Sequence, residues 1–444
     1  MIWLELGVLV ACVALGARLG GIALGTVAGV GLVVFVLILG LPPGGPPGVV
    51  IGMIIATITA VATMQAAGGL DYLVAAAARV MRHRPQYITV VAPIVTWLLV
   101  LASGTTHVIY ALLPIIAEVS ERADVRPERP LSISVVAGFH GVRASPISAA
   151  TVAIFGFLAP MGVTLPQLLA ITIPSTLIAV LAGALSVAWR GVPLSQDPEY
   201  QRRIATGLVA RPEPTPAPDG RALINAKGST LLFAAGVLLI LLIGAVPSLR
   251  PVYDLPATAA IETDQVTMGA AIMIVMLAIA GLTMIFFQAS PKAALKGSIM
   301  SSGVSAIICI VGVSWLGSSF FEGNRTLIVD GVSSLVRAHP WMFAVGLFML
   351  TTLLFSAAAA VAILVPVGVA LGMPASVLIA SYPASSANFF LPTYGTLLAA
   401  VSFDRTGTTR IGKYLLDHSF MRPGLVATVT AVVVAFAIGS VILR

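Results

Sequence analysis

The chain has 444 residues, of which 58% are hydrophobic and only 9% are charged. Soluble domains carry about 25% charged residues, so this composition excludes an ordinary soluble domain. The net charge of +7 does not indicate a nucleic-acid partner, because the basic residues lie in short loops between apolar runs, where the positive-inside rule places them.

Apolar runs long enough to cross a bilayer as helices recur along the whole chain. We expect crossings at 2–17, 20–41, 49–68, 130–162, 166–189, 229–248, 266–289, 297–320, 374–402 and 422–443. Two further apolar stretches, 87–119 and 341–372, are interrupted in the middle. Each is too long for one membrane span and too short for two, so we expect each to form a re-entrant hairpin. The expected fold class is an all-α polytopic membrane protein with about ten transmembrane helices and two hairpins.

Charge distribution predicts an orientation. With the N-terminus outside, 19 of the 24 Lys and Arg residues fall on the inner side, four fall outside, and Arg143 lies within a membrane segment. We therefore expect both termini to be periplasmic in a bacterial inner-membrane protein. The polar, proline-rich stretch 191–228 predicts a cytoplasmic linker between an N-terminal half, 1–190, and a C-terminal half, 229–444.

A stripe of small residues, Gly21, Gly25 and Gly29, lies in the second expected crossing. Such stripes let two helices approach closely in a membrane. The stripe indicates either helix packing within the chain or the seam of a homodimer.

An internal repeat links the two hairpins. The first copy carries Pro85, Pro114 and Pro146, and the second carries matching prolines 255, 252 and 246 residues further along. Each copy has a polar tip within its hairpin and a polar break in the crossing that follows. Five expected crossings separate the hairpins, and an odd number inverts the second copy relative to the first, as in many secondary carriers.

The helix breaks are where we expect a binding site. Broken helices at membrane depth are tolerated only where they line a cavity or are buried in protein. Half-helix N-termini present free N–H groups and partial positive charge, which suits an anion. Small hydroxyls at such breaks either contact a ligand or cap the helix without one. The candidate binding residues are Ser103, Gly104, Thr105, Thr106, His107, Ser145, Pro146, Ser148, Ser356, Ala357, Asn388, Pro392, Thr393 and Tyr394, together with Arg143.

Arg143 is the sharpest candidate among them. A cation at membrane depth costs at least about 2.5–3.5 kcal/mol on insertion scales, so it requires a compensating partner. The acids within the expected membrane segments, Glu5 and Glu118, lie near segment edges. We therefore expect a substrate carboxylate to pair with Arg143. The alternative is that its guanidinium snorkels or binds backbone carbonyls at the break.

The sequence contains no motif for metal binding, nucleotide binding or catalysis. There is no metal-ligand cluster, nucleotide-binding loop or Ser/His/Asp arrangement, so we expect no cofactor, no metal and no enzymatic activity. The polar run 404–413 lacks the glycine spacing of a phosphate loop, and we interpret it as structural. A channel and a membrane enzyme or sensor are the alternatives from other classes.

Several motifs resemble one known family. They occupy 16–22, 64–73, 144–150, 173–177, 391–394 and 405–413, and include Ala144-Ser145-Pro146-Ile147-Ser148. On these motifs the chain resembles the anaerobic C4-dicarboxylate transporter (Dcu) family, and within it the DcuA-like branch. The resemblance implies exchange or uptake of fumarate, malate, succinate and aspartate, inverted repeats as in the ion-transporter superfamily, and an elevator motion. A sodium- or proton-coupled symporter for a different organic anion is the alternative.

Overall fold

The computed structural model describes residues 2–19, 22–46, 48–207, 221–253, 265–324, 339–354, 356–392, 394–412 and 417–443. Apart from two isolated β-bridges, regular structure in these residues is helical. The N-terminal half contains α1 (Ile2–Leu19), α2 (Ala23–Leu32), η1 (Val33–Ile38), α3 (Gly48–Ala66), α4 (Gly69–His83), α5 (Ile88–Ser103), α6 (Ile109–Arg122), α7 (Glu128–Ala144), α8 (Ala149–Leu158) and α9 (Leu165–Ala188).

The C-terminal half follows the short helix α10 (Pro198–Ala205). It contains α11 (Arg221–Ala245), α12 (Met268–Phe287), α13 (Pro291–Lys296), α14 (Ser298–Gly323), α16 (Met342–Leu354), α17 (Ala357–Ala370), α18 (Ala375–Ser381), η7 (Tyr382–Phe389), α19 (Gly395–Phe403) and α20 (Met421–Ile442). Within the described residues, eight helices are long and apolar enough to cross a membrane. The all-α polytopic fold predicted from the sequence is therefore confirmed, while the number of crossings and the repeats stay predictions.

Both predicted hairpins are pairs of short helices. The arms α5, α6, α16 and α17 have 16, 14, 13 and 14 residues, which is at most about 24 Å of helix. A bilayer core is about 30 Å thick, so α6, α16 and α17 are too short to span it. Together with the 3-10 turn before it, α5 reaches 19 residues and is one of the eight long apolar helices. Both predicted broken spans are also interrupted, between α7 and α8 and between α18 and α19.

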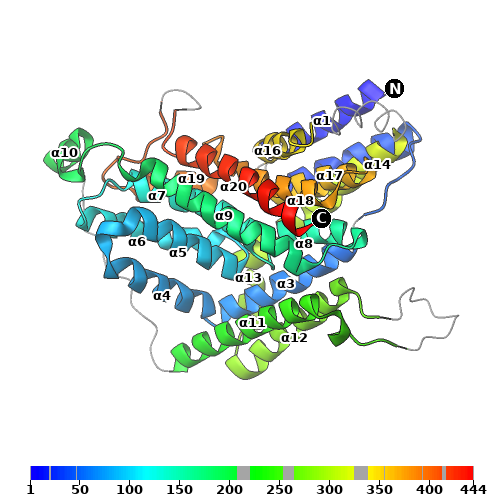
Figure 1. The fold of residues 1–444 in the computed structure, drawn as a ribbon, viewed down its shortest axis with the longest axis horizontal. Coiled ribbons are helices and arrows are strands. Elements are labelled where there is room, and N and C mark those ends of the chain that lie inside the picture. The colour runs from blue at the N-terminus through cyan, green and yellow to red at the C-terminus, as the bar shows by residue number, and fades with distance from the viewer. Residues whose placement is uncertain are drawn as a thin grey trace.

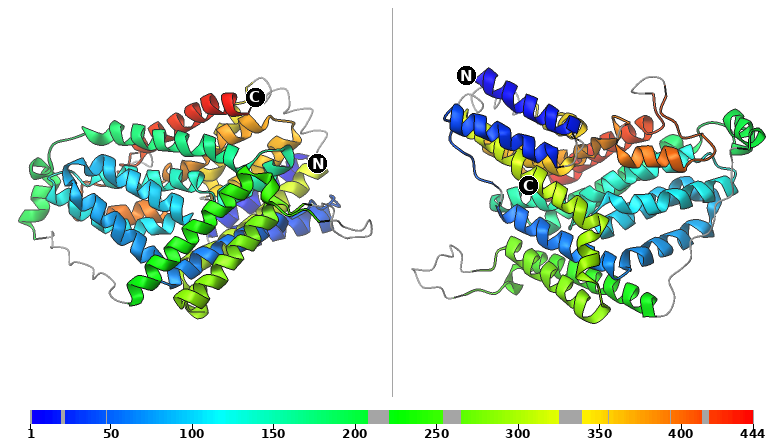
Figure 2. Two further views of the ribbon diagram at one scale, coloured as in Figure 1. Left: turned by 60° about the horizontal axis from the view of Figure 1, so that its bottom comes forward. Right: turned by 180° about the vertical axis from the view of Figure 1, so that it is seen from behind.

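The helices pack as two groups. In the first, α1 lies against α2, α11 against α12, α2 against α14, and α3 against α12. In the second, α5 packs on α7, α16 packs on η7, and α9 runs along α20 (Figure 1). Exchanging the halves maps each contact in this description onto another, a symmetry expected of a duplicated chain. Figure 2 shows α11 and α12 on the outside of the first group.

Three details differ from the expected elements. Helix α4 is amphipathic, with Ala77, Ala78 and Met81 buried and Arg79 exposed, and its charges made it look like a loop. Helix α10 lies inside the expected linker. Helix α11 begins at Arg221, earlier than the expected linker end at 228, because the intervening residues are good helix formers.

Within the small-residue stripe, Gly25 packs inside the chain, whereas a Cβ added to Gly29 would meet no atom within 4 Å. Gly25 lies on α2 where this helix crosses α14, and a Cβ added to Gly312 would lie 2.0 Å from the Gly25 carbonyl oxygen. Only glycine permits this backbone approach. Gly21 lies outside the described residues. The start of α1 and the end of α20 both lie in the half of the molecule away from α10 (Figure 1).

Candidate functional site

Four helix N-termini surround one cavity between the two helix groups. The cavity has a volume of about 650 Å³. Its lining includes the 3-10 turn that leads into α6 and the first residues of α8, α17 and α19. Each N-terminus presents unpaired backbone N–H groups and roughly half a positive charge. Residues of α3 and α14 in the other helix group, among them Thr57 and Ser301, complete the lining.

The tip of the first hairpin forms because of two adjacent residues. Gly104 ends α5 with φ +70°, a left-handed conformation that glycine adopts without strain. Thr105 then begins the next turn, and its Oγ1 accepts a hydrogen bond from the His107 backbone N–H at 3.3 Å. A Cβ on Gly104 would lie 2.9 Å from the Ile147 side chain and 3.2 Å from its carbonyl, so the tip sits directly on the first helix break.

In the first broken span, α7 ends two residues before Pro146. Ser145 is extended, with φ −79° and ψ 125°, because a residue before proline disfavours the helical region. Ser148 then caps α8 by accepting from the Thr151 N–H at 3.1 Å. Its hydroxyl also donates to the Val142 carbonyl at 2.6 Å, so it satisfies both helix ends at the break.

The second repeat builds its part of the site in the same way. Ser356 caps α17 through its Oγ, which accepts from the Ala359 N–H at 3.2 Å. In the second broken span, Asn388 is 4% exposed and lines the cavity. None of the hydrogen bonds between described residues involves its side-chain amide. Tyr394 precedes α19, bonds Thr106 through its hydroxyl, and packs edge-on against Phe139.

Arg143 joins the two broken spans. It is 2% exposed, and its Nε donates to Ser385 Oγ at 3.0 Å while Nη2 donates to the Ser385 carbonyl. This is the backbone pairing that the sequence left as an alternative. Among the described residues, no ion pair involves Arg143, and its remaining terminal nitrogen, Nη1, has no hydrogen-bond partner. Arg143 also lines the cavity, so one donor-bearing nitrogen is left for a ligand there.

The structure brings most of the candidate residues together. The cavity lining contains Ser103, Gly104, Thr105, Thr106, His107, Arg143, Ser356, Ala357, Asn388 and Tyr394. It does not include Ser145, Pro146, Ser148 or Pro392, which are buried beside it, and Thr393 lies outside the described residues.

The sequence did not predict two groups of residues at the site: the partner of Arg143, and the part of the cavity lining that comes from α3 and α14. Ser385 lies in the predicted break but its role at Arg143 depends on the crossing of the two spans. The lining residues of α3 and α14 sit in uninterrupted helices, where only the isolated polar side chains Thr57, Ser301 and Ser305 signal a cavity.

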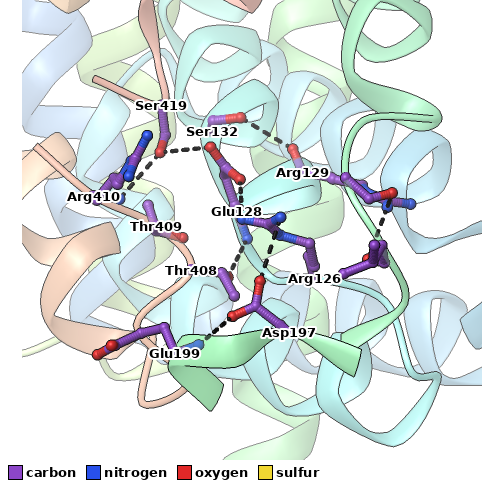
Figure 3. A network of polar contacts seen from close by, with 12 residues as sticks. Arg126, Glu128, Arg129, Ser132, Asp197, Glu199, Thr408, Thr409, Arg410 and Ser419 are labelled. Carbon is purple, nitrogen blue, oxygen red and sulfur yellow. Dashed lines mark hydrogen bonds and ion pairs between the residues drawn. The ribbon is translucent and has the colours of Figure 1, made fainter. Parts of the chain in front are cut away.

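The polar run after α19 takes part in a network of polar contacts with the start of α7 (Figure 3). Asp404 is 2% exposed, and its carboxylate accepts hydrogen bonds from Thr406, Thr408 and Thr409 at 2.5 to 2.9 Å. Ser419 and Thr408 in turn bond Glu128 at the start of α7. These contacts fit the structural interpretation of this run.

Helix α10 is attached to the same network. Arg126 pairs with both Glu128, at 3.0 Å, and Asp197, at 3.3 Å, and Asp197 caps α10. Hydrogen bonds from Arg202 and Arg203 lower the pKa of Glu199 to about 2. The network therefore joins α10, the start of α7 and the loop before α20 (Figure 3).

Interrupted apolar helices around a cavity with several polar side chains in its lining are the architecture of secondary membrane transporters, and comparison with known proteins agrees with this class. The chain belongs to the anaerobic C4-dicarboxylate membrane transporter family, whose model matches residues 1–443. A Wolinella succinogenes protein named C4-dicarboxylate transporter DcuA is 41% identical over 443 residues, covering 100% of both chains. The protein of that name from Escherichia coli K12 is 40% identical over 444 residues, again covering 100% of both chains.

A solved structure shares the fold. The crystal structure of the Alcanivorax borkumensis YdaH transporter matches with a TM-score of 0.57 and 15% identity, covering 88% of this chain and 84% of that one. At this identity the likeness concerns the fold alone.

Proposed function

We propose that the chain is a secondary carrier for C4-dicarboxylates. The observation that carries this proposal is the convergence of four helix N-termini and Arg143 on one cavity. Together they offer several N–H donors and net positive potential around one space. Two carboxylates of one small molecule can then each meet helix N–H groups, with Arg143 Nη1 and the Asn388 amide as further donors.

The two helix groups support an elevator mechanism. The hairpins, the broken spans, α9 and α20 form a transport unit, and α1–α3, α11, α12 and α14 form a scaffold. The cavity lies between them, so displacement of the unit along the scaffold would move the bound diacid across the membrane. An empty site keeps an uncompensated buried cation, which opposes that displacement until a dianion neutralises it.

The same proposal covers the repeats, the membrane topology, the mode of transport and the oligomeric state. The halves 1–190 and 229–444 are inverted repeats joined by a cytoplasmic linker, and both termini are periplasmic in a bacterial inner membrane. The carrier works by exchange or uptake, as a monomer or homodimer. A sodium- or proton-coupled symporter of another organic anion is the second candidate, which the same assay tests.

Counterflow in proteoliposomes tests the carrier function. We expect radiolabelled succinate to accumulate transiently in vesicles preloaded with unlabelled succinate, and uptake to saturate. A channel gives no counterflow. Arms with and without a sodium gradient or a pH gradient separate exchange from symport, and a panel of other organic anions tests the alternative substrates.

Substitution of Arg143 tests the site. Arg143→Ala is expected to lower succinate uptake at least about a hundredfold, because losing a charged partner of a buried anion costs about 3 kcal/mol or more. The matched control is Arg79→Ala, which removes the same charge from the exposed face of α4. Normal uptake by a folded Arg143→Ala protein would remove Arg143 from the site.

A further inference from the structure

Helix η7 places three polar side chains in one row. It is a continuous 3-10 helix of eight residues, whereas runs of this form rarely exceed about three or four. Side chains three positions apart eclipse one another in a 3-10 helix, so Tyr382, Ser385 and Asn388 share one face. In an α-helix, at about 100° per residue, Asn388 would be turned about 120° away from Tyr382. The 3-10 form therefore keeps all three side chains on one side.

The first member of the row, Tyr382, ties η7 to α8. Its side chain is 0% exposed, and its hydroxyl lies 2.9 Å from Thr151 Oγ1. The Thr151 hydroxyl donates to the Val142 carbonyl at 3.1 Å, so it accepts from Tyr382. Among the described residues, the cavity lining includes neither Tyr382 nor Thr151. The bond between them therefore acts on the site without touching a ligand.

The other two members of the row act at the cavity. Ser385 Oγ donates to the Tyr382 carbonyl at 2.8 Å and accepts from Arg143 Nε at 3.0 Å. Asn388 lines the cavity one 3-10 turn further along. A shift or rotation of η7 at Tyr382 would therefore be passed to both groups, because all three side chains belong to one short helix.

We propose that Tyr382 is a positioning residue for the diacid site and that it acts through Thr151 on the register of η7. Hydrogen-bond geometry is poorer in a 3-10 helix than in an α-helix, so the row needs an external tie to stay aligned. Without the tie, Ser385 and Asn388 turn away from their places, and a ligand has to restore them on binding. This inference rests on the proposed function, since it adds a residue to the same site.

Removal of one hydroxyl tests the proposal. Tyr382→Phe keeps the ring, and in succinate counterflow we expect the KM to rise about fivefold, the effect of losing one neutral hydrogen bond. The maximal rate should stay within about twofold, because His140 Nδ1 still lies 3.3 Å from Ser386 Oγ and holds η7 against α7. A purely structural role would instead lower the maximal rate through loss of folded carrier and leave the KM unchanged.

Ser381→Ala is the matched control. The neighbouring Ser381 hydroxyl is also buried, but it has no hydrogen-bond partner among the described residues, so its loss should leave the KM unaltered. An unchanged KM in folded Tyr382→Phe protein would overturn the inference while leaving a working carrier. Absence of succinate counterflow in the unaltered protein would instead overturn the proposed function.

Changes at Thr151 test the route. Thr151→Val removes the acceptor and should raise the KM at least about fivefold, whereas Thr151→Ser keeps the hydroxyl and should keep the KM. The double variant Tyr382→Phe/Thr151→Val should be no worse than Thr151→Val alone, because both changes break the same bond. KM increases that multiply in the double variant would overturn the route through Thr151. Should Tyr382→Phe fail to fold, equal KM values for Thr151→Val and Thr151→Ser would overturn the inference.

Discussion

Arg143 depends on Ser385 for its placement. The guanidinium leaves one broken span and is held by both the hydroxyl and the carbonyl of a single residue in the other. Two of its three nitrogens are thereby engaged, and Nη1 has no partner among the described residues. A buried cation held this way is fixed in advance, so binding a diacid does not have to order a long, flexible side chain.

Removing the Ser385 hydroxyl tests this arrangement. Ser385→Ala leaves the backbone carbonyl but deletes the partner of Nε, and we expect the KM for succinate to rise about tenfold with a smaller change in maximal rate. Ser186→Ala is the matched control, because that hydroxyl donates only to the Gly183 carbonyl of its own helix. A KM within twofold of normal in Ser385→Ala would show that the carbonyl alone positions Arg143.

At the level of elements, the positions of the helix breaks were predictable from the sequence. Which side chains at those breaks point into the cavity was not. Gly104 and the Ser145-Pro146 pair act through local backbone preferences, which the sequence displays directly. Ser145 and Ser148 were grouped with the candidates, yet they lie beside the cavity. Which way a side chain faces after a break depends on how α8 packs against α17, and no local pattern encodes that packing.

Two helices escaped prediction for related reasons. Helix α4 carries its arginines on one exposed face, so its mean polarity hid an amphipathic helix. Helix α10 has only eight residues and is stabilised by Asp197 and Arg126, a contact between segments about 70 residues apart. Short helices draw most of their stability from such tertiary contacts.

The stability of the loop between α19 and α20 should depend on the buried carboxylate of Asp404. Asp404→Asn replaces one acceptor oxygen by a donor, and at least one of the hydrogen bonds from Thr406, Thr408 and Thr409 is lost. We expect the free energy of unfolding to fall by about 2 kcal/mol, seen as a lower melting temperature in detergent. Asp71→Asn, the same change at an exposed position, should alter it much less. Equal melting temperatures would contradict the role of Asp404.

At the scale of the whole molecule, the two helix groups meet along several helix pairs. Helices α3 and α14 contact α8 and α17, and α11 and α1 add smaller contacts with α9 and α16. Within each group the contacts are more extensive, as along α9 and α20 (Figure 1). This partition is what relative motion of two bodies requires, and it arises from packing that no single segment of sequence reveals.

Engineered disulfides test that motion. Val50 of α3 and Gly156 of α8 face each other across the two groups, with 3.8 Å between the Val50 Cβ and a Cβ added to Gly156. Ala380 and Gly439 lie within the transport unit at a comparable 3.9 Å. Both separations suit a disulfide. With Cys12 and Cys309 replaced by alanine, oxidation of the Val50→Cys/Gly156→Cys protein should stop uptake, and reduction should restore it.

The Ala380→Cys/Gly439→Cys protein is the control, and its uptake should persist when oxidised. Undiminished uptake by the oxidised cross-group protein, with the disulfide verified, would exclude displacement of the unit along the scaffold. Loss of uptake in both proteins would point to a general effect of cross-linking.

The bond between Arg143 and Ser385 has a consequence for how the protein comes into being. One partner is synthesised some 240 residues before the other, so the nascent N-terminal half must insert with its guanidinium unmatched. Until Ser385, within the last 60 residues of the polypeptide, has been synthesised, that half is an incomplete membrane protein. Competence to bind a diacid is therefore acquired late in biogenesis, and by both halves at once.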